Sequence, residues 1–122
     1  MQTINTNTFA DTATSLGDSL IFRSNYQSVR IKTDDILYIQ ALADYVIIKT
    51  TSAKYITLST MKDMAKLLEG RGFARTHRSY IVNLDKIYNI KGSSIIVHTD
   101  SNKTTIPVGR AFKKDFRQSL AA

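Results

Sequence analysis

The stretch ILYIQALADYVIIKT, residues 36–50, decides the fold class. It holds two runs of β-branched and aromatic residues, which are separated only by Ala43 and Asp44. Such residues favour β-strands, because their side chains pack well on a pleated, half-buried surface. The run KYITL, residues 54–58, continues the pattern after a short polar interval. We therefore predict several strands close together in this part of the chain.

Two more strands are predicted before this stretch. LIFRS (20–24) and SVRIK (28–32) flank NYQ as a hairpin, and TDD (33–35) is a second turn signal. Strand runs continue after it and recur about every eight to twelve residues, a spacing typical of all-β sandwiches or barrels.

The strands after residue 85 are predicted from the same signals. KIYNIKG (86–92) and SIIVHTD (94–100) form a hairpin about residues 91–94. KTTIPV (103–108) contains the only proline of the chain, Pro107. Proline has no amide donor, so this strand should lie at the edge of a sheet or end there.

One helix is predicted to interrupt the strands. Thr60 is its candidate N-cap, with Asp63 three residues later as in a capping box, and Gly70 can end it in a left-handed conformation. Between them lies an apolar stripe at helical spacing, formed by Met61, Met64, Ala65, Leu67 and Leu68. We expect this stripe to pack on the sheets rather than to line a cofactor pocket.

A short terminal helix is predicted in GRAFKKDFRQSL, residues 109–120. Its apolar side carries Phe112, Phe116 and Leu120 at intervals of four residues. The roughly opposite side carries four cations, namely Arg110, Lys113, Lys114 and Arg117.

The 122 residues carry a formal net charge of +7, and the excess is unevenly placed. Residues 1–61 hold five Lys/Arg and five Asp/Glu, whereas residues 62–122 hold twelve Lys/Arg against five Asp/Glu. A one-sided basic excess is typical of proteins that bind a polyanion such as nucleic acid. It also fits a basic β-rich interaction or sensory module with an acidic partner, and charge alone leaves both open.

A chain of this length makes one domain, or one domain with a tail. Residues 1–19 are rich in Thr, Asn, Ser and Asp, so we expect a flexible lead or interdomain linker there and the folded domain over residues 20–122. The absence of cysteine excludes disulfides and thiolate chemistry and fits a reducing cytoplasm. The sequence shows no secretory signal and no apolar run of membrane-spanning length.

Catalysis finds little support in the sequence. The histidines are His77 and His98, and Ser79 lies near His77 without any recognisable catalytic motif. Two histidines without a local carboxylate pattern make a weak metal site. Asp34 and Asp35 precede a strand in a turn, where aspartates bond the local backbone. We therefore expect no enzyme activity, no cofactor and no metal.

The stretch FARTHRSYIVNLDKI, residues 73–87, carries a more specific signal. It resembles the hallmark of the LytTR-type DNA-binding domains of LytR/AlgR-like response regulators, in which Phe-x-Arg-x-His-Arg-Ser is followed by an aromatic residue and Ile-Val-Asn. ILYIQALADYVIIKT is similar to an upstream element of this family, and IPVGRAFKKDF (106–116) to its closing element. The three elements occur in order, and the resemblance covers about residues 20–120.

This resemblance implies a mainly β fold of stacked antiparallel sheets, with one amphipathic helix and a short C-terminal helix. It implies double-stranded DNA as the partner, with loops entering successive major grooves and two domains meeting as a dimer on paired repeat sites. A receiver domain or kinase system would then act outside this chain.

The resemblance and the basic turns together give a set of expected DNA-binding residues: Ala43, Asp44, Tyr45, Arg75, Arg78, Lys91, Arg110, Lys113 and Lys114. Within the hallmark, His77, Ser79 and Asn83 are expected to satisfy backbone groups and so hold the segment that presents the arginines. Asp44 departs from the basic pattern. Its carboxylate is repelled by phosphate, but it can accept a hydrogen bond from the amino group of cytosine.

Overall fold

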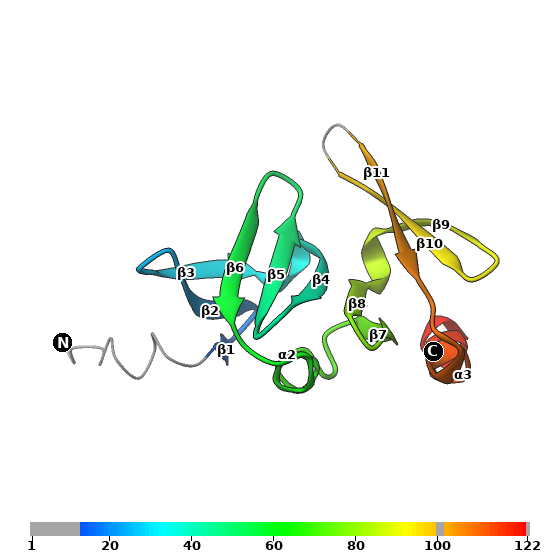
Figure 1. Ribbon diagram of the computed structural model, residues 1–122, viewed down its shortest axis with the longest axis horizontal. Helices are drawn as coiled ribbons and strands as arrows, with labels where there is room; N and C mark the ends of the chain where they lie inside the picture. The colour runs from blue at the N-terminus through cyan, green and yellow to red at the C-terminus, as the bar shows by residue number, and fades with distance from the viewer. Residues whose placement is uncertain (1–12, 100–101, 122) are drawn as a thin grey trace.

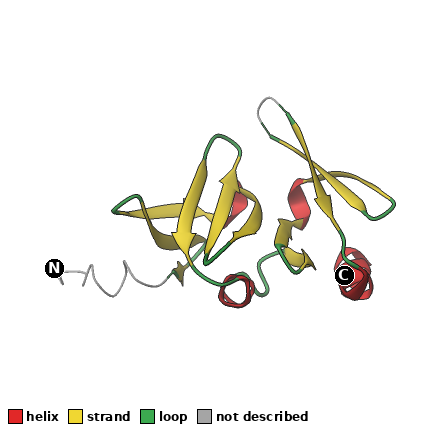
Figure 2. Cartoon of the chain, in the orientation of Figure 1, coloured by secondary structure: helices red, strands yellow, loops and turns green. Residues whose placement is uncertain are grey.

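The computed structural model describes residues 13–99 and 102–121, which form three antiparallel sheets and two α-helices (Figures 1 and 2). The strands are β1 (Thr14–Leu16), β2 (Ser19–Ser24), β3 (Gln27–Lys32), β4 (Ile36–Leu42), β5 (Tyr45–Thr50), β6 (Lys54–Leu58), β7 (Phe73–His77), β8 (Tyr80–Asn83), β9 (Ile87–Lys91), β10 (Ser94–His98) and β11 (Lys103–Pro107). The helices are α2 (Met61–Leu67) and α3 (Lys113–Ala121), with 3-10 turns η1 (Thr33–Asp35), η2 (Leu84–Lys86) and η3 (Arg110–Phe112). The predicted mainly β fold is confirmed.

The stretch 36–50 forms two strands in the middle of the largest sheet, whose order is β6-β5-β4-β8-β7. One face of this sheet packs against the sheet β1-β2-β3, which lies behind it in Figure 1, and against α2. Val46 and Ile48 alternate along β5 toward this side and are fully buried together with Phe22 and Met64. This alternation is what a strand with one buried face requires.

A second core lies on the opposite face of the same sheet. The sheet β11-β10-β9 and helix α3, at the right of Figure 1, cover its β4, β8 and β7 part. Tyr38, Val82, Val97 and Phe116 meet there. Burial raises the pKa of the Tyr38 phenol above its ordinary value. The residues that the structure describes therefore form two cores that share one central sheet.

Most of the caps and turns were correctly predicted from local sequence signals. The Thr60 hydroxyl accepts a hydrogen bond from the backbone N–H of Asp63 at the start of α2, and Gly70 has a positive φ just after the helix. The β2–β3 turn holds Asn25 and Tyr26, both with positive φ, as in the favoured two-residue hairpin turns. β11, which ends at Pro107, is an edge strand as predicted.

The two ends of the domain differ from the expectation. Residues 14–16 fall within the stretch assigned to a lead, yet they pair with β2. A short polar edge strand is held by backbone hydrogen bonds, so the sequence has no apolar pattern from which the strand could be predicted. Residues 1–12 and Asp100 of the β10 run lie outside the described residues. At the other end, Phe112 lies in η3 rather than in α3, and Leu120 stays exposed while Phe116 is buried.

Within the described part of the chain, the helices are too short or too polar for any of them to cross a membrane.

Candidate nucleic-acid interface

The β7–β8 turn, residues 78–79, is bound to its neighbours on both sides. On one side the backbone N–H of Ala41, near the end of β4, donates to the carbonyl of Ser79 at 2.9 Å. On the other side the N–H of Gly109 donates to the carbonyl of Thr76 at 2.7 Å. The turn therefore lies between the β4–β5 turn and the segment that leads into η3.

A further bond extends this arrangement to the β9–β10 turn. The N–H of Val108 donates to the carbonyl of Ser93 at 2.8 Å. Backbone hydrogen bonds thus connect four segments that are far apart in the sequence, namely residues 41–45, 76–79, 108–110 and 91–93. We call this set the loop row. Because backbone bonds of this kind are short and directional, they fix the order of the loops.

Most of the expected DNA-binding residues lie in or beside the loop row. Exposed members are Ala43, Asp44, Tyr45, Arg78, Lys91 and Arg110, with Lys114 exposed at the start of α3. Arg75 and Lys113 are half-buried. Asp44 is the one carboxylate in this set, and six of the other eight residues are Lys or Arg. The row can therefore present cations to a polyanion over several loops at once.

Arg75 contacts the domain itself rather than projecting freely. Its Nη2 donates to the carbonyl of Arg78 at 2.8 Å, and its guanidinium carbon lies 5.7 Å from the centre of the Phe112 ring. Its Nε is buried, with no hydrogen-bond partner among the described residues. This guanidinium links the turn that carries Arg78 to the 3-10 turn that begins at Arg110.

The other polar residues of the hallmark also contact the backbone. The Nδ1 atom of His77 accepts from the N–H of Ser79 at 3.1 Å, which fixes the imidazole at the turn. Asn83 is buried; its Nδ2 donates to the carbonyl of Ile36 at 2.9 Å and its Oδ1 accepts from the N–H of Asp85. Ser79 therefore contacts His77 through its backbone N–H.

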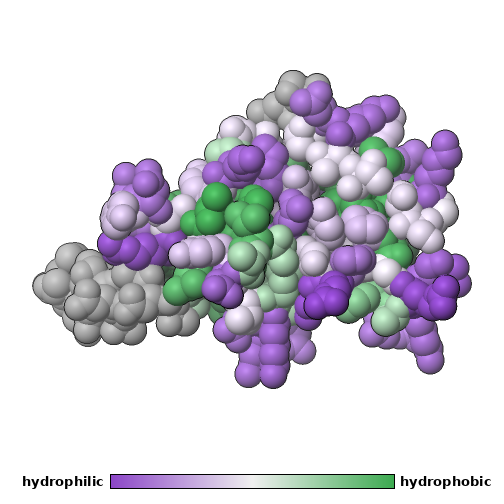
Figure 3. All heavy atoms as spheres, viewed as in Figure 1, coloured by the Kyte–Doolittle hydropathy of each residue, from purple (hydrophilic) through white to green (hydrophobic). Residues whose placement is uncertain are grey.

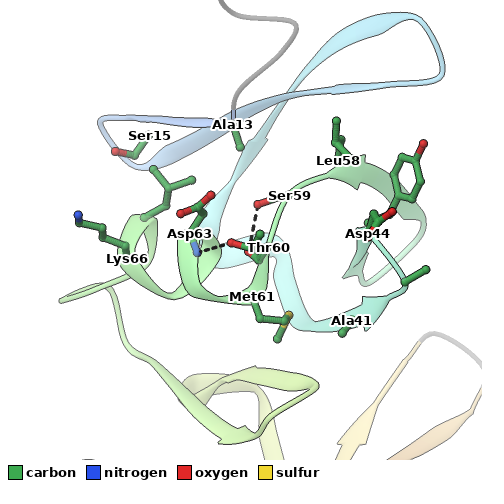
Figure 4. Close-up of a pocket in the computed structure, with 13 residues that line it drawn as sticks. Ala13, Ser15, Ala41, Asp44, Leu58, Ser59, Thr60, Met61, Asp63 and Lys66 are labelled. Atoms are coloured by element: carbon green, nitrogen blue, oxygen red, sulfur yellow. Dashed lines mark hydrogen bonds between the residues drawn. The ribbon is translucent and has the colours of Figure 1, made fainter.

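A groove of about 920 Å³ begins beside the β4–β5 turn and runs toward α2 (Figure 4). Asp44 and Tyr45 line it at one side, and Met61 and Asp63 line it at the helix. Two of its hydroxyls make local hydrogen bonds: that of Thr60 accepts from the N–H of Asp63 in the helix cap, and that of Ser59 donates to the carbonyl of Thr60. The groove places Asp44 at an open, concave part of the surface.

Comparison with known proteins shows the family and the fold of this chain. Residues 26–121 match the family described as the LytTr DNA-binding domain. The chain belongs to the LytTR family of DNA-binding domains. A solved LytTr DNA-binding domain of a response regulator from Bacillus cereus superposes with a TM-score of 0.72 at 19% identity, covering 87% of this chain and 99% of that one.

Two curated relatives of the LytTR domain are longer regulators. The sensory transduction protein LytT of Bacillus subtilis is 29% identical over 112 residues, which are 88% of this chain and 42% of the relative. The transcriptional regulatory protein LytR of Staphylococcus aureus is 32% identical over 94 residues, or 74% of this chain and 37% of the relative. The chain thus spans less than half the length of these relatives. It is a DNA-binding domain of a non-enzymatic regulator family.

Sequence reasoning missed two contributors to this LytTR site. Thr76 supplies the carbonyl that anchors Gly109, and Phe112 supplies the ring beneath Arg75. The spacing of Phe112 from Phe116 predicts both on the apolar side of one helix, and it gives no sign that Phe112 lies in a 3-10 turn before that helix. An arginine two residues before His77 and an aromatic residue just after Arg110 are signals that could have suggested the pair.

Proposed function

We propose that this LytTR domain recognises a specific double-stranded DNA sequence by placing the loop row in major grooves. The observation that supports it most is the set of backbone hydrogen bonds that aligns the loops of Asp44, Arg78 and Arg110. The major groove presents a distinct donor and acceptor pattern for each base pair, so loops that enter it can select a sequence.

We assign base recognition to the exposed arginines. Arg78 and Arg110 lie on neighbouring loops, and an arginine can donate two hydrogen bonds to the edge of guanine. Asp44 would accept from the amino group of cytosine at the other end of the row. The main chain of Ala43 and the phenol of Tyr45 would lie beside that contact.

We assign to the lysines contacts that raise the affinity for DNA without selecting a base. Lys91, Lys113 and Lys114 would neutralise phosphates, which releases counterions and makes binding weaker at high salt. For Arg75 we propose a positioning role in place of the direct DNA contact expected from the sequence. It would position Arg78 and Arg110 through the contacts described above, while His77, Ser79 and Asn83 hold the same segment.

We further propose that two such domains bind paired repeats as a dimer on DNA, within a transcription regulator of the LytT or LytR type. The support is the similarity to regulators whose length exceeds that of this chain. A receiver domain and a partner kinase would then supply the signal.

Selection of duplexes from a random pool tests this proposal. The purified domain should enrich one motif, present twice at a fixed spacing, and random duplexes should compete poorly with it. Competition by random DNA as strong as that by enriched DNA would contradict sequence recognition. A single motif without a repeat would contradict only the paired arrangement.

A further inference from the structure

Among the described residues, no layer covers one half of one face of the central sheet. The sheet β11-β10-β9 packs over the β4, β8 and β7 part of that face, where Tyr38 is buried. The β5 and β6 part carries outward residues in cross-strand pairs, Tyr45 with Leu58 and Ile47 with Ile56. Leu42 of β4 pairs with Tyr45 and extends the same row. We call these five residues the open face.

The open face is apolar and accessible. Leu58 is 57% exposed, Tyr45 46% and Ile56 45%. Figure 3 shows hydrophobic surface gathered over β5 and β6 on the side toward the viewer. Large apolar side chains that alternate outward along paired strands are what a sheet presents to another protein layer, and contiguous patches of this kind mark interaction sites.

Opposite charges stand at the two ends of the open face. Asp44 lies at the turn beside the Tyr45–Leu58 pair. The next outward pair beyond Ile47 and Ile56 is Lys49 with Lys54, about 13 Å along the strands from Tyr45. Arg23 lines a groove together with Lys54, Ile56 and Tyr45, so it adds a further cation beside the open face. The pattern along the strands is therefore acidic, apolar, basic.

We propose that the open face binds the open face of a second copy of this chain in a two-fold dimer. A two-fold axis across the strands at the Ile47–Ile56 pair reverses the strand direction of the partner. Each Asp44 then faces the lysine pair of the other copy, and the apolar residues meet in the middle. An interface related by a two-fold axis must be self-complementary in this way.

A second copy fits both ends of the face, whereas a partner of one charge fits only one end. An acidic partner would place like charge against Asp44, and a basic partner would place like charge against Lys49 and Lys54. Like charges brought together at an interface suppress the wrong partner. The dimer forms without DNA, and it withdraws Asp44 and Tyr45 from the loop row while it lasts.

Sedimentation equilibrium of the 122-residue chain without DNA tests the inference. The mass should rise with concentration from the monomer value of 13.7 kDa toward twice that value. Ile56→Lys should raise the dimer dissociation constant about tenfold or more, because it places a charge in the apolar centre. Ile90→Lys is the matched control, since Ile90 is 41% exposed on a strand of another sheet, and it should dimerise like the parent.

A charge exchange tests the two-fold geometry itself. Asp44→Lys alone places like charges together twice, and so does the double variant Lys49→Asp/Lys54→Asp; each should be monomeric. An equimolar mixture of the two should form a dimer with one copy of each, because both charged contacts are then attractive. Circular dichroism and thermal melts of each variant confirm that it is folded.

Three results would overturn the inference. They are a parent chain that stays monomeric at every concentration, a mixture that fails to dimerise although the parent dimerises, and equal effects of Ile56→Lys and Ile90→Lys. None of these results depends on DNA, so failure here is separate from failure of sequence recognition.

Discussion

Two turns of the loop row lie side by side but differ in how they are held. The β7–β8 turn carries Arg78, and its carbonyl accepts from Arg75 while the imidazole of His77 accepts from Ser79. Among the described residues, the structure gives the β4–β5 turn no side-chain hydrogen bond of this kind. There Ala43 instead has a positive φ of 53°, which is uncommon for a residue other than glycine.

This difference separates two ways of meeting DNA. A side chain on a fixed turn loses little conformational freedom on binding, so its contacts contribute more to affinity. A turn held only by its strands can adjust its shape to the DNA groove. It then loses conformational freedom on binding, which costs free energy. We therefore expect the Arg78 side chain to contribute more to the free energy of DNA binding than the Asp44 side chain.

The largest effect is expected from Arg78→Ala. Loss of a two-bond contact to guanine should cost about 1–3 kcal/mol of binding free energy, or roughly 5- to 150-fold in Kd. Asp44→Ala should cost less, and its effect should be confined to duplexes that retain the cytosine it contacts. Fluorescence anisotropy with the enriched duplex and single-base variants of it measures both.

Arg30→Ala is the control for charge in this experiment, because Arg30 is exposed on β3, in a different sheet. It should bind nearly as well as the parent. A greater loss for Asp44→Ala than for Arg78→Ala would reverse the comparison between the two turns.

A smaller effect is expected when the support of the fixed turn is removed. Arg75→Ala should weaken binding to the enriched duplex by about 1 kcal/mol, because it removes a hydrogen bond and a cation–π contact, while the slope of log Kd against log salt stays unchanged. Arg75→Lys should not restore binding, since an ammonium cannot reproduce both contacts. Phe112→Leu should give part of the same loss.

The opposite pattern would reassign Arg75 to DNA. A phosphate contact predicts that Arg75→Ala lowers the salt slope by about 1 and that Arg75→Lys restores it. In that case Phe112→Leu would leave binding to DNA nearly unchanged.

How much of this structure can be predicted from the sequence depends on how far apart in the chain the interacting residues lie. Strands 36–50, the cap at Thr60 and the edge position of Pro107 follow from local chemistry, and each was predictable. Residues 14–16 were missed, because pairing at a sheet edge needs only backbone groups. The covered and open halves of the sheet were also unpredictable, since alternation shows that a strand has two faces but not what packs on each.

The site shows the same limit. The hallmark indicated the turn that carries Arg78, and the basic pattern indicated Arg110. That Arg75 turns back toward Phe112 depends on a contact between residues 37 positions apart. Spacing within a strand gives the side of the sheet on which a residue lies, but it does not give its partner from another segment.

The smallest predicted effect concerns the less constrained turn. Ala43 occupies the first of the two residues between β4 and β5, where a positive φ favours glycine. Ala43→Gly should therefore raise the free energy of unfolding by up to about 1 kcal/mol, because relief of a left-handed alanine exceeds the added freedom of the unfolded chain. Ala111→Gly is the matched control: Ala111 is exposed in η3 without a positive φ, so glycine there should destabilise slightly. Urea unfolding of both variants measures the difference. Equal destabilisation by the two substitutions would show that the β4–β5 turn carries no strain, and the contrast between the turns would then rest on the hydrogen bonds of Arg75 and His77 alone.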